Sequence, residues 1–347
     1  MLQTQTHTLS TSNSTSPDEA LLPMIGSYWI SQSIYVAAKL GIADLLKDGA
    51  QSCEALAKCT KTNTRSLYRL MRALASIEIF TELEEGVFDS TPLAACLESD
   101  VPGSLRSLAI ISGEEAYRAW GDLLYSIQTG HNAFEHLYGM HLYEYLQQNL
   151  ESGQVSDRAM TNLSAGEAGA VAASYDFSSI NRVIDVAGGQ GLLITSVLKA
   201  NPTLQGILFD QASVIDCAIV PKESQDVAER CQLVVGNFFE SVPSGGDAYM
   251  LKRILHNWGD QQAINILKNC HDVMKLSGKL LVIEPVVPPG NEPSSSKFLD
   301  LNMLVMCPGG SERTKAEFQK LFEAAGFELT QIIATSSEVS IIEGIPV

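Results

Sequence analysis

The sequence predicts an α/β protein in which a doubly wound parallel sheet follows a smaller, mostly helical domain. From residue 177 to the end, short apolar runs typical of buried strands alternate with helical patterns, as parallel strands require. Before residue 105, three helical segments precede a hairpin, which is the order of a winged helix. We therefore expect a disordered tail over 1–17 and a winged-helix-like domain over 18–104. A helical linker should follow over 105–176, and a sheet domain over 177–347.

The elements of the N-terminal part follow from composition, apolar spacing and caps. Residues 1–17 are rich in Ser and Thr, which favours disorder. Residues 19–49 carry apolar positions at helical spacing. Ser52 is expected to cap a short helix, and a further helix is expected to begin at Asn63 or Thr64 and to reach about residue 79. A hairpin is then expected over 80–89. The linker that follows is rich in large aromatic residues, most of which we expect to serve packing.

The run VIDVAGGQG, residues 183–191, carries the most informative pattern in the chain. It predicts a buried strand over 182–186 and a helix over 192–200, joined by a turn in which a ligand can approach the backbone at Gly188, Gly189 and Gly191. The start of that helix offers free N–H groups. The next strand ends at Asp210, where such folds place an acid for ribose hydroxyls. The pattern predicts an adenosine-type ligand.

The glycine loop alone leaves three interpretations open. A dinucleotide-binding loop reads G-x-G-x-x-G, whereas this run continues G-G-Q-G-L-L and lacks the last glycine. Asp185 can accept hydrogen bonds from an ammonium or amide group, as S-adenosylmethionine (SAM) requires. SAM also has no pyrophosphate to hold. The loop therefore favours SAM over NAD, and a glycine turn that binds nothing is the third interpretation.

Two later motifs narrow these interpretations. LKRILHNWGD, residues 251–260, follows a predicted strand over 248–251, and PGGSERT, residues 308–314, lies near the end of the chain. With the glycine loop, these motifs strongly resemble the SAM-dependent small-molecule O-methyltransferases. That family includes plant caffeate and flavonoid enzymes, acetylserotonin methyltransferase, and bacterial enzymes acting on polyketides and carotenoids. The resemblance extends from about Met24 to Glu343.

The resemblance implies a catalytic histidine with two supporting glutamates. His256 matches the family's general base, and Glu284 and Glu312 match the acids that flank its ring. Methyl transfer from a sulfonium is an in-line displacement, so positioning matters most. A phenol has a pKa of about 10, and a nearby base raises the fraction of phenolate as the bond forms. Histidine suits this role, and a carboxylate beside it would fix its tautomer.

The resemblance also implies the cofactor and acceptor sites. SAM would be bound, without a metal, by Asp185, Gly188, Gly189, Gly191, Asp210, Asn237, Phe238 and Lys252. Asn237 replaces a usual acid, and Ala187 replaces a usual glycine in what we interpret as a conservative change. The acceptor would be contacted by Met160, Trp258, Asn302 and Met303. The two methionines could hold a flat ring by sulfur–aromatic contact.

Composition limits the partners that we expect. The 23 Lys and Arg residues against 40 Asp and Glu residues give a net charge of −17, which disfavours nucleic acid and anionic membranes. The N-terminus has no signal-peptide pattern. Seven scattered cysteines without a C-x-x-C pair suggest reduced thiols in a cytoplasmic protein. The resemblance implies a homodimer formed by the N-terminal domain, whose helices would also close the partner's pocket.

Three functions of different classes remain open. An O-methyltransferase acting on a phenolic or enolic hydroxyl of a small secondary metabolite is favoured by His256, Glu284 and Glu312. An N-methyltransferase, or a non-methylating enzyme on the same fold, is the second, because a fold does not fix the chemistry. A winged-helix regulator that binds SAM or a metabolite is the third, and the winged-helix pattern also raises the question of DNA binding. Its predicted wing is acidic and would face phosphate badly.

Overall fold

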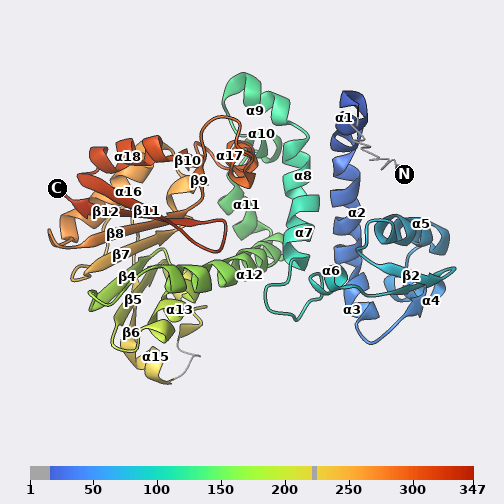
Figure 1. Ribbon diagram of the computed structural model, residues 1–347, viewed down its shortest axis with the longest axis horizontal. Coiled ribbons are helices and arrows are strands. Elements are labelled where there is room, and N and C mark those ends of the chain that lie inside the picture. The colour runs from blue at the N-terminus through green and yellow to red at the C-terminus, as the bar shows by residue number, and fades with distance from the viewer. Residues whose placement is uncertain (1–15, 221–224) are drawn as a thin grey trace, which may run out of the picture. The chain divides into compact units, whose positions relative to one another are not determined.

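The computed structural model describes residues 16–220 and 225–347, which fall into two compact units, 1–95 and 96–347 (Figure 1). The disorder predicted for 1–15 lies outside the described residues. Ser16 caps a helix that begins at Pro17, within the span predicted to be disordered. The predicted boundaries near 104 and 176 stay predictions, and the helices between them belong to the second unit.

The first unit combines short helices with a small antiparallel sheet of strand order β1-β3-β2. Its elements are α1 (Pro17–Ile25), α2 (Ser27–Leu40), α3 (Ile42–Leu46), β1 (Gln51–Ser52), α4 (Cys53–Thr60), α5 (Thr64–Ala75), β2 (Thr81–Glu84), β3 (Val87–Asp89) and α6 (Pro92–Ala95). The predicted hairpin is confirmed. Ser52 caps α4 as predicted. Asn63 caps α5, which begins at Thr64 within the predicted start but ends before residue 79. The two-residue strand β1 was not predicted.

The first unit exposes much apolar surface on its first two helices. No residue of α1 is buried. Trp29 on α2 is 66% exposed. Large apolar side chains that are exposed on these two helices are Leu21, Leu22, Met24, Ile25, Tyr28, Trp29, Ile30 and Val36. The unit's own core is built elsewhere, around Leu56, Met71 and Phe88. So many exposed large apolar side chains on two successive helices are typical of an interface with another protein.

The second unit begins with helices and continues into a seven-stranded sheet. The helices are α7 (Arg106–Gly113), α8 (Glu115–Trp120), α9 (Leu123–Thr129), α10 (Ala133–Tyr138), α11 (Leu142–Gln148) and α12 (Leu150–Ser174). The sheet region contains β4 (Arg182–Val186), α13 (Leu192–Ala200), β5 (Gln205–Asp210), α14 (Ala212–Ile215), α15 (Gln225–Arg230), β6 (Cys231–Val235), β7 (Ala248–Lys252), η2 (Leu255–Asn257), α16 (Asp260–Val273), β8 (Lys279–Glu284), β9 (Val286–Val287), α17 (Ser295–Met306), β10 (Arg313–Thr314), α18 (Lys315–Ala324), β11 (Phe327–Ala334) and β12 (Ser340–Pro346).

The sheet has the order β11-β12-β8-β7-β4-β5-β6. Strands β4 to β8 pair in parallel, as predicted. The expectation of strictly alternating strands and helices is wrong at the C-terminus, because β11 passes directly into β12. Strand β12 is antiparallel to both of its neighbours, β8 and β11. A parallel neighbour needs a crossover, whereas an antiparallel one needs only a short turn.

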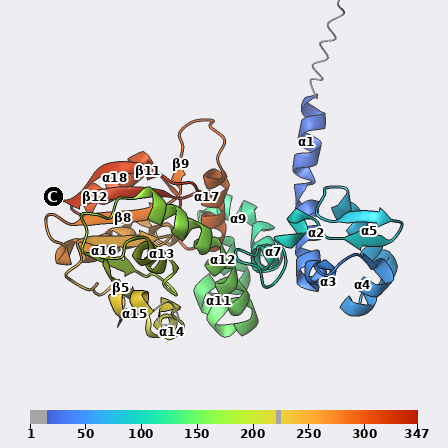
Figure 2. The ribbon, with the colours of Figure 1, turned by 60° about the horizontal axis from the view of Figure 1, so that its bottom comes forward.

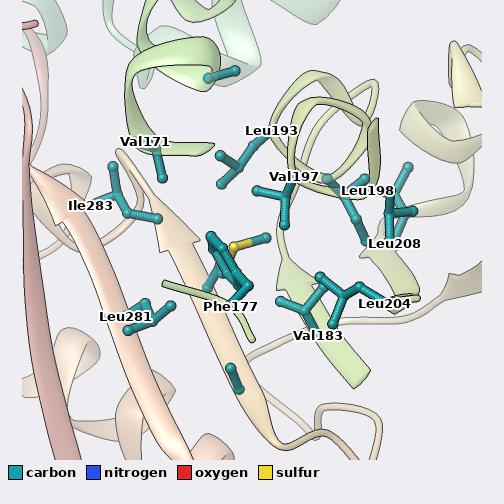
Figure 3. Close-up of a cluster of buried hydrophobic side chains, with 14 of the residues drawn as sticks. Val171, Phe177, Val183, Leu193, Val197, Leu198, Leu204, Leu208, Leu281 and Ile283 are labelled. Atoms are coloured by element: carbon teal, nitrogen blue, oxygen red, sulfur yellow. The ribbon is translucent and has the colours of Figure 1, made fainter. Parts of the chain in front are cut away.

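Two apolar cores cover the two faces of this sheet. On one face, α12 and α13 pack over β4, β5 and β8, with Phe177, Leu193 and Leu281 among the buried residues (Figures 2 and 3). On the other face, α16 and α18 pack over the same sheet through residues such as Leu267 and Phe318. Both faces are therefore covered, as a parallel sheet requires. Within 16–220 and 225–347, no helix is both long and apolar enough to span a membrane.

Candidate active site

The candidate site lies where four parallel strands of the second unit end. Strands β4, β5, β7 and β8 run in one direction, so their carboxyl ends meet at one edge of the sheet. At this edge they present Val186, Asp210, Lys252 and Glu284. Ligands of open α/β sheets bind outside the carboxyl ends of the strands. Three predicted site residues that lie far apart in the sequence, Asp210, Lys252 and Glu284, are thus brought to one edge.

The glycine loop after β4 needs its glycines for two different reasons. Gly189 and Gly191 have φ angles of 61° and 91°, which L side chains rarely adopt. Gly188 instead lacks room, because a Cβ there would lie 2.5 Å from the Asp185 Cγ. Ala187 has a φ of 56°. Its replacement of a usual glycine is therefore not conservative, since alanine is strained in this region.

Asp185 presents a buried carboxylate beneath the loop. Its side chain has no solvent exposure, and neither oxygen has a hydrogen-bond partner within 3.5 Å. The nearby Ile194 N–H still favours the ionised form of Asp185 and so acts to lower its pKa. Burial raises the pKa of Asp185 to about 7, against the opposing effect of Lys252. A buried acceptor that lacks a partner fits a ligand that brings a donor, such as the ammonium group of SAM.

Asp210 is held rigidly at the end of β5. Its Oδ2 accepts a hydrogen bond from the Gly189 N–H at 2.9 Å, and its Oδ1 accepts one from the Gln211 N–H at 2.7 Å. The carboxylate is thereby tied to the glycine loop. Each oxygen keeps a second lone pair, so the group can still accept bonds from two ribose hydroxyls. The prediction that Asp210 binds the ribose stays a prediction that this geometry permits.

His256 lies in the short 3₁₀ turn η2 and is 6% exposed. Its Nδ1 lies 2.6 Å from the Glu312 Oε1. A carboxylate only accepts hydrogen bonds, so Nδ1 carries the proton of the neutral ring. The other ring nitrogen, Nε2, is then an acceptor that can take a proton. Glu312 is held in turn, because its N–H donates to the Asp300 Oδ1 at 2.9 Å.

Glu284 supports the histidine in a different way from the one expected. Its Oε1 accepts a hydrogen bond from the backbone N–H of His256 at 3.0 Å, so it contacts the main chain and does not bond to the ring. Glu284 has no solvent exposure, and burial raises its pKa. Its second oxygen has no hydrogen-bond partner. The two glutamates therefore differ: Glu312 orients the ring, and Glu284 holds the turn that carries it.

The buried Arg313 connects the last motif to this turn. It donates to the carbonyl oxygens of Leu255 and Trp258 at 3.0 and 2.9 Å, and it forms an ion pair with Asp260. The Arg313 guanidinium thus provides hydrogen-bond donors for backbone carbonyl oxygens at both ends of this turn. The residue order Glu312-Arg313 therefore places one side chain on the ring and the next on the backbone that carries it.

The aromatic residues near the expected adenine site form their own group. Trp258 lies edge-on to Phe239, with ring centroids 4.8 Å apart, and also contacts Phe238. The structure therefore places Trp258 beside a predicted cofactor residue, whereas it was expected at the acceptor. The Asn237 Oδ1 accepts a hydrogen bond from the Phe239 N–H at 3.0 Å, so one lone pair of this oxygen is already used.

The predicted acceptor residues are only partly brought together. Met303 and Asn302 lie on α17, where Met303 packs near Phe134. The Asn302 Oδ1 accepts a hydrogen bond from the Trp120 Nε1–H at 2.9 Å. Met160 lies on α12 and is 46% exposed, outside that cluster. The pairing of Met160 with Met303 around one flat ring stays a prediction.

Lys252 has partners that the sequence did not reveal. Its Nζ donates to the Ser164 Oγ at 2.8 Å and to the Glu167 Oε2 at 3.2 Å. Glu167 also receives three bonds from the guanidinium of Arg253. In the sequence, the sign of this contact was a single acid, Glu167, within SAGEAGA, a stretch of α12 made mostly of small residues. Among the described residues no group of three or more His, Cys, Asp or Glu could hold a metal ion.

A glycine loop, a strand-end acid and a buried carboxylate at one edge of the sheet fit the class of SAM-dependent methyltransferases, because ligands of such sheets bind outside the carboxyl ends of the strands. Residues 120–328 match the family model for the O-methyltransferase domain, and residues 22–100 match that for the O-methyltransferase dimerisation domain. The chain belongs to this O-methyltransferase family, and its cofactor is SAM. The N-terminal unit is thus a dimerisation domain of the family.

Relatives in secondary metabolism cover nearly the whole chain. Phenazine O-methyltransferase of Lysobacter antibioticus is 46% identical over 94% of this chain and 96% of its own length. Phenazine-1-carboxylate N-methyltransferase of Pseudomonas aeruginosa is 32% identical over 93% and 95%. A solved methyltransferase of calicheamicin biosynthesis, in its S-adenosylhomocysteine (SAH)-bound form, superposes with a TM-score of 0.83 at 36% identity, covering 94% of this chain and 97% of that one. The chain is thus a methyltransferase of secondary metabolites.

Proposed function

We propose that this enzyme methylates a hydroxyl oxygen of a planar, fused aromatic metabolite of the phenazine type. The observation that carries the proposal is the contact between the His256 Nδ1 and the Glu312 Oε1 at 2.6 Å. It leaves Nε2 as a base at the sheet edge where the predicted cofactor residues lie. The similarity to phenazine O-methyltransferase supports the acceptor class.

In the proposed mechanism, the chain orients both reactants and removes one proton. When bound, SAM would supply an electrophilic methyl group, whose bond to the sulfonium sulfur breaks and leaves the neutral thioether SAH. His256 accepts the proton of the acceptor hydroxyl at Nε2 while the new carbon–oxygen bond forms. Glu312 stabilises the imidazolium that results, because its carboxylate already lies on Nδ1. Glu284 and Arg313 hold the turn, so the ring does not have to be ordered during the reaction.

An N-methyltransferase is the second candidate, and the relative that methylates phenazine-1-carboxylate favours it. A ring nitrogen with a free lone pair has no proton to lose before it attacks the methyl group. Such an acceptor would need positioning but no base. The two candidates therefore differ in whether the reaction depends on His256.

The test offers the parental enzyme labelled SAM with two acceptors, a hydroxyphenazine and a phenazine carboxylate without a hydroxyl. We expect methylation of the hydroxyphenazine, with NMR placing the new methyl group on oxygen. Product from the second acceptor alone, with the methyl group on nitrogen, would overturn the O-methyl assignment. Methylation of neither acceptor, alongside methylation of an unrelated phenol, would overturn the phenazine class.

We also propose that the enzyme is a homodimer formed through its first unit. The dimerisation-domain match and the exposed apolar side chains of α1 and α2 support this proposal. Leaving that surface in water would be costly, whereas a second copy can cover it.

A further inference from the structure

A buried cluster of one anion and two cations lies beside the cofactor edge. Glu167 on α12 contacts Lys252 at 3.2 Å and Arg253 at 2.6 Å. The Arg253 Nε donates to the Glu167 Oε1 at 2.9 Å and to its Oε2 at 3.2 Å, which makes the guanidinium contact extensive. Ser164, almost one turn earlier on α12, binds Lys252 as well. Helix α12 is thus bonded to Lys252 at the end of β7, and to the following Arg253, through the side chains of Ser164 and Glu167.

These charges are largely removed from water. The side chains of Glu167 and Lys252 are 9% and 11% exposed. Although burial acts to raise it, the bonds and charges of Arg253 and Lys252 hold the pKa of Glu167 below its usual value. Burial lowers the pKa of Lys252, and Glu167 opposes that shift. With all three groups ionised, the cluster carries one net positive charge, and without Glu167 it would carry two.

The cluster lies next to Asp185, the residue predicted to bind the positively charged end of SAM. Lys252 is the last residue of β7, and Met250 on that strand pairs with Asp185 on β4. The charge of Lys252 acts on Asp185 across this pair. SAM brings a sulfonium to this edge, and SAH, its product, has a neutral thioether instead. An uncompensated cation in the cluster would therefore repel SAM and leave SAH almost unaffected.

We propose that Glu167 sets the charge of the cofactor site and so allows the sulfonium of SAM to bind beside Lys252 and Arg253. Glu167 acts through these two cations, which makes it a positioning and electrostatic residue without contact to the reacting atoms. The role is specific to the charged donor. The proposed role of Glu167 depends on the family's cofactor and not on the acceptor atom proposed above. It would therefore still hold if the methyl group were transferred to nitrogen.

Calorimetric binding of SAM and SAH to the full-length protein tests this role without any turnover. Glu167→Gln keeps the shape of the side chain and removes its charge. Two unit charges about 10 Å apart, at an effective dielectric constant of about 20, change a binding constant by roughly 15-fold, and salt screening reduces this effect. We therefore expect the ratio of Kd for SAM to Kd for SAH to rise by about three- to tenfold. Asp157→Asn, which removes an exposed charge from the same helix, should leave the ratio unchanged.

Two further variants separate charge from structure. Lys252→Met alone removes a cation, so the ratio should fall below the parental value even where both ligands bind more weakly. Adding Lys252→Met to Glu167→Gln restores the net charge and should return the ratio towards the parental value. An equal loss of SAM and SAH affinity in Glu167→Gln would overturn the proposal. If that variant does not fold, a ratio that is unchanged or raised in Lys252→Met would overturn it instead.

Discussion

At the scale of single residues, the two glutamates next to His256 are not equivalent. The Glu312 carboxylate lies on the ring nitrogen, whereas the Glu284 carboxylate lies on the backbone N–H. The orientation and tautomer of the ring depend on the Glu312 contact. The position of the turn depends on the Glu284 contact. The sequence could nominate both residues from the motif, but the division of labour depends on contacts across 56 and 28 residues, which no local pattern contains.

His256→Gln should lower turnover by about 10²–10⁴-fold while SAM binding persists, because the base is lost and the cofactor residues are not. Glu312→Gln should cost less than this but more than Glu284→Gln, since only Glu312 bonds to the ring. The measurement is steady-state turnover with the identified acceptor. The exposed His131→Gln serves as the matched control and should match the parent. Parental turnover in His256→Gln would point to an acceptor that needs no base.

Asp185 should make the cofactor-free protein less stable as the pH rises. Burial raises its pKa to about 7, so between about pH 4 and pH 7 the folded state keeps a proton that the unfolded state has lost. The free energy of unfolding then falls with rising pH, by on the order of 4 kcal/mol at most.

Urea unfolding at several pH values, at one protein concentration, checks this effect in the parent and in Asp185→Asn. The asparagine cannot titrate, so its stability should fall less over this range. Other buried acids such as Glu284 act in both proteins and cancel in the comparison. Parallel stability curves for the two proteins would contradict the prediction.

At the scale of elements, local signals predicted some boundaries to the residue and missed others entirely. Strand β4 and helix α13 begin and end where expected, because glycines and apolar runs mark them in the chain itself. Strand β1 exists only because Gln51 and Ser52 pair with β3. The reversed β12 likewise depends on pairing with β8. The role of Glu167 depends on cations 85 and 86 residues away.

The glycine loop between β4 and α13 gives a prediction at this scale. A Cβ at position 188 would lie 2.5 Å from both the Asp185 Cγ and the Leu208 Cδ1. Gly188→Ala should therefore lower the free energy of unfolding by about 1–3 kcal/mol and weaken SAM binding. Gly166→Ala is the matched control, because a Cβ at that helical position meets nothing within 4 Å. It should be neutral or stabilise the protein by up to about 1 kcal/mol. Equal effects in the two variants, by urea unfolding, would refute the steric argument.

At the scale of the whole molecule, the apolar surface of α1 and α2 should control assembly. Light scattering of the parent should give a mass near twice 37.5 kDa at micromolar concentration. Trp29→Glu places a charge on the exposed surface and should shift the mass towards the monomer, whereas Asp18→Asn should not. A parental protein that stays monomeric at these concentrations would rule out the proposed homodimer.

The 25-residue helix α12 also limits how this enzyme can diversify. Met160, the predicted acceptor wall, and Glu167, in the charge cluster, lie on the same continuous helix. Seven residues are almost two full turns, so the two side chains leave the helix in nearly the same direction, about 10 Å apart. One inserted or deleted residue between them would rotate one by about 100° relative to the other. If Met160 lines the acceptor pocket as predicted, substitution there can change the acceptor range, whereas a change in helix length between the two residues would also move Met160 relative to the charge cluster of Glu167.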